Sequence, residues 1–181
     1  MKTHHKIIAL IPVMIASLFL GFFLWALING KDPNQIPSTH IGKAIPQTTI
    51  KPIPNYARKG FSYQALKKEP IALVNFFASW CLPCRAEHST LGQIAKHENI
   101  PIYGINYKDQ SQDIINWLDE LGDVYTQIGF DHLGKSAIIW GITGVPESFI
   151  IKNGIITYRF QGPIIGVEGK NRLMRAIQDN P

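Results

Sequence analysis

The sequence predicts an α/β domain, with a mixed central sheet covered by helices on both faces, preceded by one transmembrane helix. Two observations carry this prediction. A charge-free apolar run occupies residues 7–28. After it, strand-like and helix-like segments alternate and end in a hairpin, a pattern that produces a sheet with crossover helices and added antiparallel strands.

Residues 7–28 are long enough to cross a membrane. At about 1.5 Å of rise per residue, a helix of this length spans a hydrocarbon core of about 30 Å. A cleaved signal peptide is the alternative, since Lys2 and Lys6 give a positive start. The run is longer than a signal core, however, and it ends in Trp25-Ala26-Leu27-Ile28 rather than at a small-x-small cleavage site. We therefore expect a cytoplasmic tail at 1–6, an anchor at 7–28, a linker at 29–40 and a folded domain at 41–181.

The orientation of the anchor rests on segment length rather than on charge. Lys2 and Lys6 on one side are nearly matched by Lys31 and Lys43 on the other, so the basic-residue rule gives almost a tie. Because a long domain that follows a first apolar segment is usually translocated, we expect the folded domain outside the cytoplasm.

The net charge of +5 is unevenly distributed. Residues 1–68 hold nine Lys or Arg and one acid, whereas residues 69–181 hold nine Lys or Arg and twelve acids. The basic excess therefore lies beside the membrane segment, where attraction to anionic headgroups explains it. We expect no nucleic-acid partner.

The expected elements follow from apolar periodicity and turn signals. The run at 71–77 is typical of a fully buried strand, and Asn153-Gly154 is typical of a tight hairpin turn. Ser111 is the expected N-cap of an amphipathic helix. The complete prediction is a strand at 71–77, a helix at 82–97, a strand at 100–106, a helix from Ser111 to Leu121, a strand at 124–128, hairpin strands at 148–151 and 155–160, and a terminal helix around Leu173 to Ile177.

Two cysteines, Cys81 and Cys84, stand at the start of the helix that follows the buried strand. A sulfur at a helix N-terminus faces unpaired N–H groups and the positive end of the helix dipole, which favours the thiolate. We expect Cys81, the more exposed residue, to attack a disulfide and Cys84 to resolve the mixed disulfide. Pro83 fits the first turn, where its missing N–H costs no intrahelical hydrogen bond.

Other uses of a CxxC motif fit this chain less well. Zinc normally takes four ligands and there is no second CxxC. Arg85 stands where a haem-attachment CxxCH motif has histidine, and a purely structural bridge across so short a loop would constrain the unfolded chain little. We expect no metal and no cofactor besides the dithiol itself. The candidate histidines form no recognisable ligand pair: His88, His97 and His132.

Several spaced motifs resemble the cytochrome c biogenesis thiol:disulfide interchange proteins, the DsbE or CcmG family of the thioredoxin-like superfamily. The resemblance runs from about residue 41 to the carboxyl end, and the family's single amino-terminal anchor also matches. The motifs are Phe76-Phe77-Ala78-Ser79-Trp80-Cys81-Leu82-Pro83-Cys84, Cys84-Arg85-Ala86-Glu87-His88, Tyr103-Gly104-Ile105-Asn106-Tyr107-Lys108-Asp109 and Gly144-Val145-Pro146-Glu147-Ser148-Phe149.

The resemblance implies a thioredoxin-like fold and a reductant in the periplasm, tethered to the inner membrane and kept reduced by a membrane thiol donor. Its implied substrate is the disulfide of apocytochrome c, or of a maturation partner, before haem attachment. Two alternatives stay open. One is a general extracytoplasmic disulfide oxidase or isomerase, and the other is a non-catalytic, metal-carrying thioredoxin-like module.

The resemblance also implies roles for residues around the dithiol. It predicts a cis bond between Val145 and Pro146, with the proline packed against the CxxC motif. Glu87 and Glu147 look like the acids that surround the active site in this family. Carboxylates near a thiol disfavour its thiolate form, or relay protons to the leaving sulfur.

Three further positions are interpreted from the same matching. Asn75 stands where cytoplasmic thioredoxins carry a buried acid beneath the active site, so Glu87 or Glu147 is the expected proton source. Trp80 is expected to pack over the active site. Phe76 and Phe77 are most simply core residues.

Overall fold

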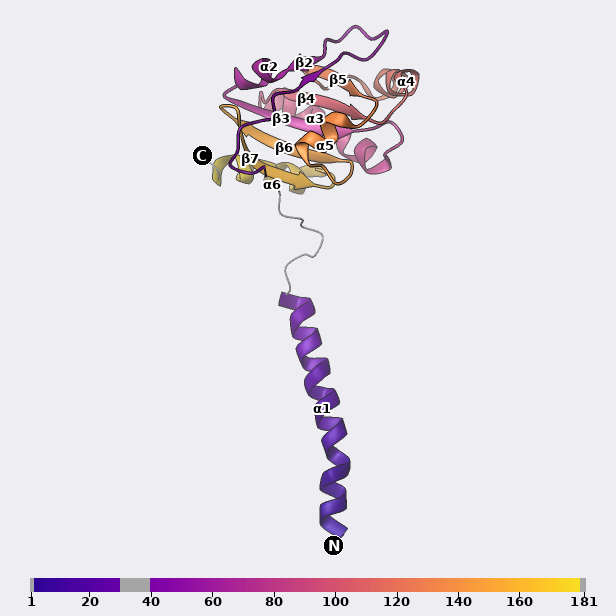
Figure 1. Ribbon diagram of the computed structural model, residues 1–181, viewed down its shortest axis with the longest axis vertical. Coiled ribbons are helices and arrows are strands. Elements are labelled where there is room, and N and C mark those ends of the chain that lie inside the picture. Colours follow the sequence, from indigo (N-terminus) through magenta and orange to yellow (C-terminus); the bar gives the residue numbers. More distant parts are fainter. Residues whose placement is uncertain (1, 30–39, 180–181) are drawn as a thin grey trace. The chain divides into compact units, whose positions relative to one another are not determined.

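A computed structural model describes residues 2–29 and 40–179 (Figure 1). The chain divides into an amino-terminal helical unit and a second, larger unit. Most of the predicted linker, residues 30–39, lies outside the described residues. The first unit contains α1 (Lys2–Asn29), which includes the predicted anchor, and its segment Ile11–Ile28 is long and apolar enough to cross a membrane.

The larger unit is built on a five-stranded sheet with the order β5-β4-β3-β6-β7. The three strands β3, β4 and β5 are parallel, whereas β6 and β7 run antiparallel to their neighbours, so the sheet is mixed as predicted. A separate hairpin of β1 and β2 packs along β5. The strands are β1 (Thr49–Ile50), β2 (Phe61–Ser62), β3 (Ile71–Phe77), β4 (Ile102–Tyr107), β5 (Gln127–Asp131), β6 (Glu147–Lys152) and β7 (Ile155–Gln161).

Helices cover both faces of this sheet, as predicted. One face carries α3 (Leu82–His97), α4 (Ser111–Leu121) and α6 (Gly166–Asp179), and the other carries α2 (Tyr63–Lys67), α5 (Lys135–Trp140) and the β1–β2 hairpin. Side chains alternate along β3, so Phe77 joins the first core and Phe76 the second. Both phenylalanines are fully buried, which confirms their assignment to the core.

Several predicted boundaries differ from the structure. The strand expected at 100–106 is β4, at Ile102–Tyr107, and the hairpin strands expected at 148–151 and 155–160 are one residue longer at three of their ends. Two other differences have a local cause. The third strand was expected at 124–128, but β5 begins only at Gln127, because the Tyr125 N–H bonds to the Asp123 carboxylate at 2.9 Å and not to a neighbouring strand. Gln110, not Ser111, is the N-cap residue of α4, and its N–H donates to Asp109.

Four short elements were not predicted. The strands β1 and β2 have two residues each, and α2 and α5 have five and six. Segments this short do not complete the two turns or alternations on which a periodicity argument depends. Glycines in the left-handed conformation, Gly134 and Gly141, bound α5 on both sides.

Candidate active site

The two cysteines lie where β3 passes into α3. Cys81 is the N-cap residue of α3, and its sulfur accepts the Cys84 backbone N–H at 3.1 Å. Pro83 lies in the first turn, as predicted. The two sulfurs are joined in a disulfide, so the structure shows the oxidised form. Cys81 is the more exposed cysteine, as expected, although both are buried in this form, at 4% and 1% exposed.

The loop before β6 lies against the same core. The Val145–Pro146 peptide bond is cis, which confirms that prediction. Val145 packs against the cluster that contains both cysteines. Pro146 is buried, and its carbonyl accepts the Gly162 N–H at 3.0 Å.

Both carboxylate oxygens of Glu147 have bonding partners, and one of them is bonded to this loop. One carboxylate oxygen accepts the Thr143 N–H at 2.7 Å, the Thr143 hydroxyl at 2.6 Å and the Gly144 N–H at 3.1 Å. The other oxygen forms an ion pair with Arg159 at 2.7 Å, and both charged side chains are almost fully buried. The carboxylate therefore fixes the segment just before the cis-proline.

Glu87 lies one turn beyond Cys84 on the buried side of α3. Its carboxyl group accepts the Asn75 side-chain N–H at 2.9 Å and the Ile164 backbone N–H at 2.8 Å. Neither donor is charged, and the side chain is fully buried. Burial raises the pKa of Glu87 to about 7, although the bonds from Ile164 and Asn75 oppose the shift. This carboxyl can therefore gain or lose a proton near neutral pH.

Asn75 is the centre of a buried polar network that includes Glu87. Its amide N–H also donates to Ser148 Oγ at 3.0 Å, and its carbonyl accepts the Tyr125 hydroxyl at 3.1 Å. Ser148 pairs with Asn75 in the β3–β6 register. Tyr125 fits over β4 because the facing residue is Gly104, where a Cβ would lie 2.8 Å from the tyrosine ring. Sequence reasoning missed Tyr125 and Ser148, since both looked like ordinary strand residues.

Trp80 lies on the surface next to Cys81. Its side chain is 59% exposed, and the indole N–H donates to the Lys108 carbonyl at 3.1 Å. Leu82, on the other side of Cys81, is also exposed. An apolar rim therefore flanks the more N-terminal cysteine. Asp109 accepts two hydrogen bonds from Ser79, which lies in the turn between β3 and α3. Sequence reasoning did not identify Asp109 as a site residue.

His88, the first histidine after the CxxC motif in the sequence, is held in place by Trp117 and Gly122. His88 is buried against the Trp117 ring, and its Nε2–H donates to the Gly122 carbonyl at 2.8 Å. Burial lowers the pKa of His88, although the Gly122 carbonyl opposes that shift. The other ring nitrogen, Nδ1, is buried and has no hydrogen-bond partner among the described residues.

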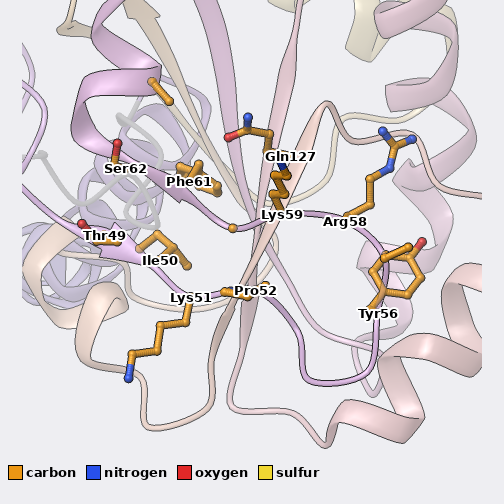
Figure 2. Close-up of a pocket in the computed structure, with 13 residues that line it drawn as sticks. Thr49, Ile50, Lys51, Pro52, Tyr56, Arg58, Lys59, Phe61, Ser62 and Gln127 are labelled. Carbon is orange, nitrogen blue, oxygen red and sulfur yellow. The ribbon is translucent and has the colours of Figure 1, made fainter.

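A hollow of about 680 Å³ lies on the β1–β2 hairpin (Figure 2). Its lining comes from the segment 49–65 and Gln127, so it shares no residue with the CxxC motif. Tyr56 and Arg58 at its edge both bond to Asp123, at 3.0 and 2.7 Å. These contacts tie the hairpin to the segment that leads into β5.

A disulfide at a helix N-terminus, with a cis-proline loop packed on the same core of a mixed sheet, is the arrangement with which thioredoxin-like thiol:disulfide oxidoreductases exchange dithiol for disulfide. This protein is an enzyme of that class. Comparison with known proteins identifies the family: the sequence model of the Redoxin family matches residues 41–173.

Two relatives narrow the assignment. The chain is 36% identical over 170 residues to the thiol:disulfide interchange protein DsbE homolog of Paracoccus denitrificans, covering 93% of this chain and 92% of the relative. It is 39% identical to the thiol:disulfide interchange protein DsbE of Escherichia coli K12, covering 87% and 86%. The chain therefore belongs to the DsbE family of thiol:disulfide interchange proteins.

The fold has solved counterparts. A secreted Mycobacterium tuberculosis disulfide oxidoreductase, described as homologous to E. coli DsbE, superimposes with a TM-score of 0.61. The match covers 73% of this chain and 96% of that one at 16% sequence identity, and it supports the thioredoxin-like fold.

Proposed function

We propose that this protein is a periplasmic reductant of cytochrome c maturation, held at the inner membrane by α1. It reduces the disulfide of apocytochrome c, or of a maturation partner, before haem attachment. A membrane thiol donor then restores its own dithiol. Membership of the DsbE family supports this assignment, and α1 is suited to serve as a single-pass anchor.

One observation of the site favours a reductant over an oxidase. A dithiol protein is a strong oxidant when its reduced form is stabilised, and a stabilised thiolate is the usual means. Here the buried acid Glu87 lies one turn from Cys84, with uncharged partners alone. Its negative charge disfavours a neighbouring thiolate, which destabilises the reduced form and makes the couple more reducing.

The reaction begins with attack by the Cys81 thiolate on one sulfur of the substrate disulfide. That bond breaks, a mixed disulfide forms, and the first substrate thiolate leaves and takes a proton. Cys84 then attacks the Cys81 sulfur, breaks the mixed disulfide and releases the second substrate thiol. The substrate gains two electrons and two protons, and the protein ends with the Cys81–Cys84 disulfide seen here.

We propose different roles for the two acids of the site. Glu87 accepts the proton that Cys84 loses when it attacks, because its pKa of about 7 suits proton transfer at neutral pH. Glu147 positions the cis-proline loop through Thr143 and Gly144. Trp80 and Val145 supply apolar contacts for the substrate segment beside Cys81.

The deciding experiment is equilibration of the Cys81–Cys84 couple with glutathione. We expect a reduction potential near that of thioredoxin, about −270 mV. A value near that of the oxidant DsbA, about −120 mV, would overturn the reductant role and favour the general oxidase. A protein that binds metal through both thiols but reduces no protein disulfide would support the metal-carrying alternative.

A further inference from the structure

The corner formed by Lys108 and Asp109, just after β4, contacts the two residues that precede Cys81. Asp109 is buried, at 3% exposed. Its Oδ2 accepts the Ser79 backbone N–H at 2.6 Å, and its Oδ1 accepts the Ser79 hydroxyl at 2.8 Å. One side chain therefore holds both the main chain and the side chain of a residue in the turn between β3 and α3.

The remaining contacts require a carboxylate at this position. Oδ2 also accepts the Asn106 side-chain N–H at 2.9 Å, and Oδ1 also accepts the Gln110 backbone N–H at 2.9 Å. Each oxygen thus accepts a backbone N–H, from Ser79 on one side and Gln110 on the other. An asparagine has one acceptor oxygen, so in either orientation its NH₂ group would face a backbone donor.

Lys108 contributes to this corner through its main-chain carbonyl and N–H. It adopts the left-handed conformation, with φ of 45°, which residues other than glycine enter at a cost and which is common at functional sites. In this conformation its carbonyl accepts the Trp80 indole N–H at 3.1 Å, while its own N–H donates to the Asp131 carbonyl at 3.1 Å. The exposed Trp80 ring is thereby fixed beside Cys81.

We propose that Asp109 is a positioning residue for disulfide exchange. It holds the Ser79–Trp80 turn, and through that turn it places the Cys81 sulfur at the N-terminus of α3 and the Trp80 ring at the rim. The proposal rests on the thiol:disulfide exchange activity of the family, and it holds whichever way electrons flow. A failure of the reductant assignment would therefore leave it intact.

The test is the rate at which the reduced, full-length protein reduces a small aromatic disulfide, measured against pH up to the plateau where Cys81 is entirely thiolate. At the plateau the rate reports geometry, because the thiolate fraction no longer changes. We expect Asp109→Asn to lower the plateau about tenfold or more, as small misplacements of reacting groups do. The midpoint of the same profile gives the pKa of Cys81 in each variant.

The matched control is Glu69→Gln. Glu69 accepts a hydrogen bond from the Tyr103 hydroxyl at 2.8 Å, but it precedes β3, at the opposite end of that strand from the turn before Cys81. We expect this variant to lose stability to urea and to keep the wild-type plateau. Equal slowing in both variants, or an unchanged plateau in folded Asp109→Asn, would overturn the proposal.

Ser79→Ala keeps the test decisive if Asp109→Asn does not fold. It removes one of the four bonds to the carboxylate and leaves the charge in place, and we expect the plateau to fall about threefold, in keeping with one lost hydrogen bond. A wild-type plateau in Ser79→Ala, with Asp109→Asn unfolded, would reduce Asp109 to a purely structural residue.

Discussion

The Asn75 side chain donates a hydrogen bond of 2.9 Å to Glu87. Asn75 belongs to β3, and Glu87 comes from the helix α3 that packs on the sheet. The helix therefore supplies the buried carboxyl, while the strand supplies an uncharged partner. The carboxyl and the resolving cysteine are thus on one helix, a single turn apart.

Replacing Glu87 by Gln should change how the rate of disulfide reduction depends on pH. Because the pKa of Glu87 is raised to about 7, the wild-type profile should show an inflection there, and Glu87→Gln should remove it. The rate at pH 7 should fall about tenfold or more if Glu87 carries the proton. Glu98→Gln, at the far end of the same helix, is the control. Profiles left unchanged by both Glu87→Gln and Glu147→Gln would refute a proton-carrying acid.

The same carboxyl should make the stability of the oxidised protein depend on pH. Its pKa is about 7 when folded against 4.5 as the ordinary value, so between these pH values the folded state binds more protons than the unfolded state. Stability should then fall by about 3 kcal/mol as pH rises from 4.5 to 7, and the contribution should stay constant above. Urea denaturation at several pH values should show this slope in the wild type and lose it in Glu87→Gln. A slope shared by both proteins would assign it to other groups.

Asn75→Asp should place two carboxyl groups where one hydrogen bond now lies. Because both cannot ionise easily at this distance, the pair should share a proton, with one apparent pKa above that of Glu87 alone. We expect a protein that is far less stable at pH 8 than at pH 5. Asn75→Ala, which removes the bonds to Glu87 and Tyr125 without adding charge, should be destabilised at both pH values. The difference between the two variants isolates the electrostatic part.

Sequence reasoning succeeded where long periodic segments carried the information. The strand at 71–77 and the helix at 82–97 have their predicted bounds, because an unbroken apolar run and a helical stripe determine them. Only two members of the network around Asn75 were identified from the sequence, Asn75 itself and Glu87. Their partners Ser148 and Tyr125 were not. Ser148 is opposite Asn75 in the β3–β6 register, and Tyr125 fits because Gly104 has no side chain.

Asp109 illustrates what a linear pattern does not reveal. It belongs to a quoted motif, yet its neighbour in space is Ser79, thirty positions away in the sequence. The parallel pairing of β3 and β4 brings their carboxyl ends to one edge of the sheet, and that is what joins the two residues. A polar residue just after a buried strand was the available signal.

Glu147→Gln should show that Glu147 has a structural role and that Glu87 carries the proton. The substitution leaves the Arg159 charge buried without its partner, and breaking a buried pair in this way costs about 3 to 5 kcal/mol. Urea denaturation should show that loss, while the inflection near pH 7 in the rate profile should persist because Glu87 is untouched. Glu120→Gln, which breaks the exposed pair with Arg85, should leave the stability nearly unchanged, because solvent screens an exposed ion pair. If Glu147→Gln instead kept its stability and lost the inflection, the two acids would have to exchange the roles proposed for them.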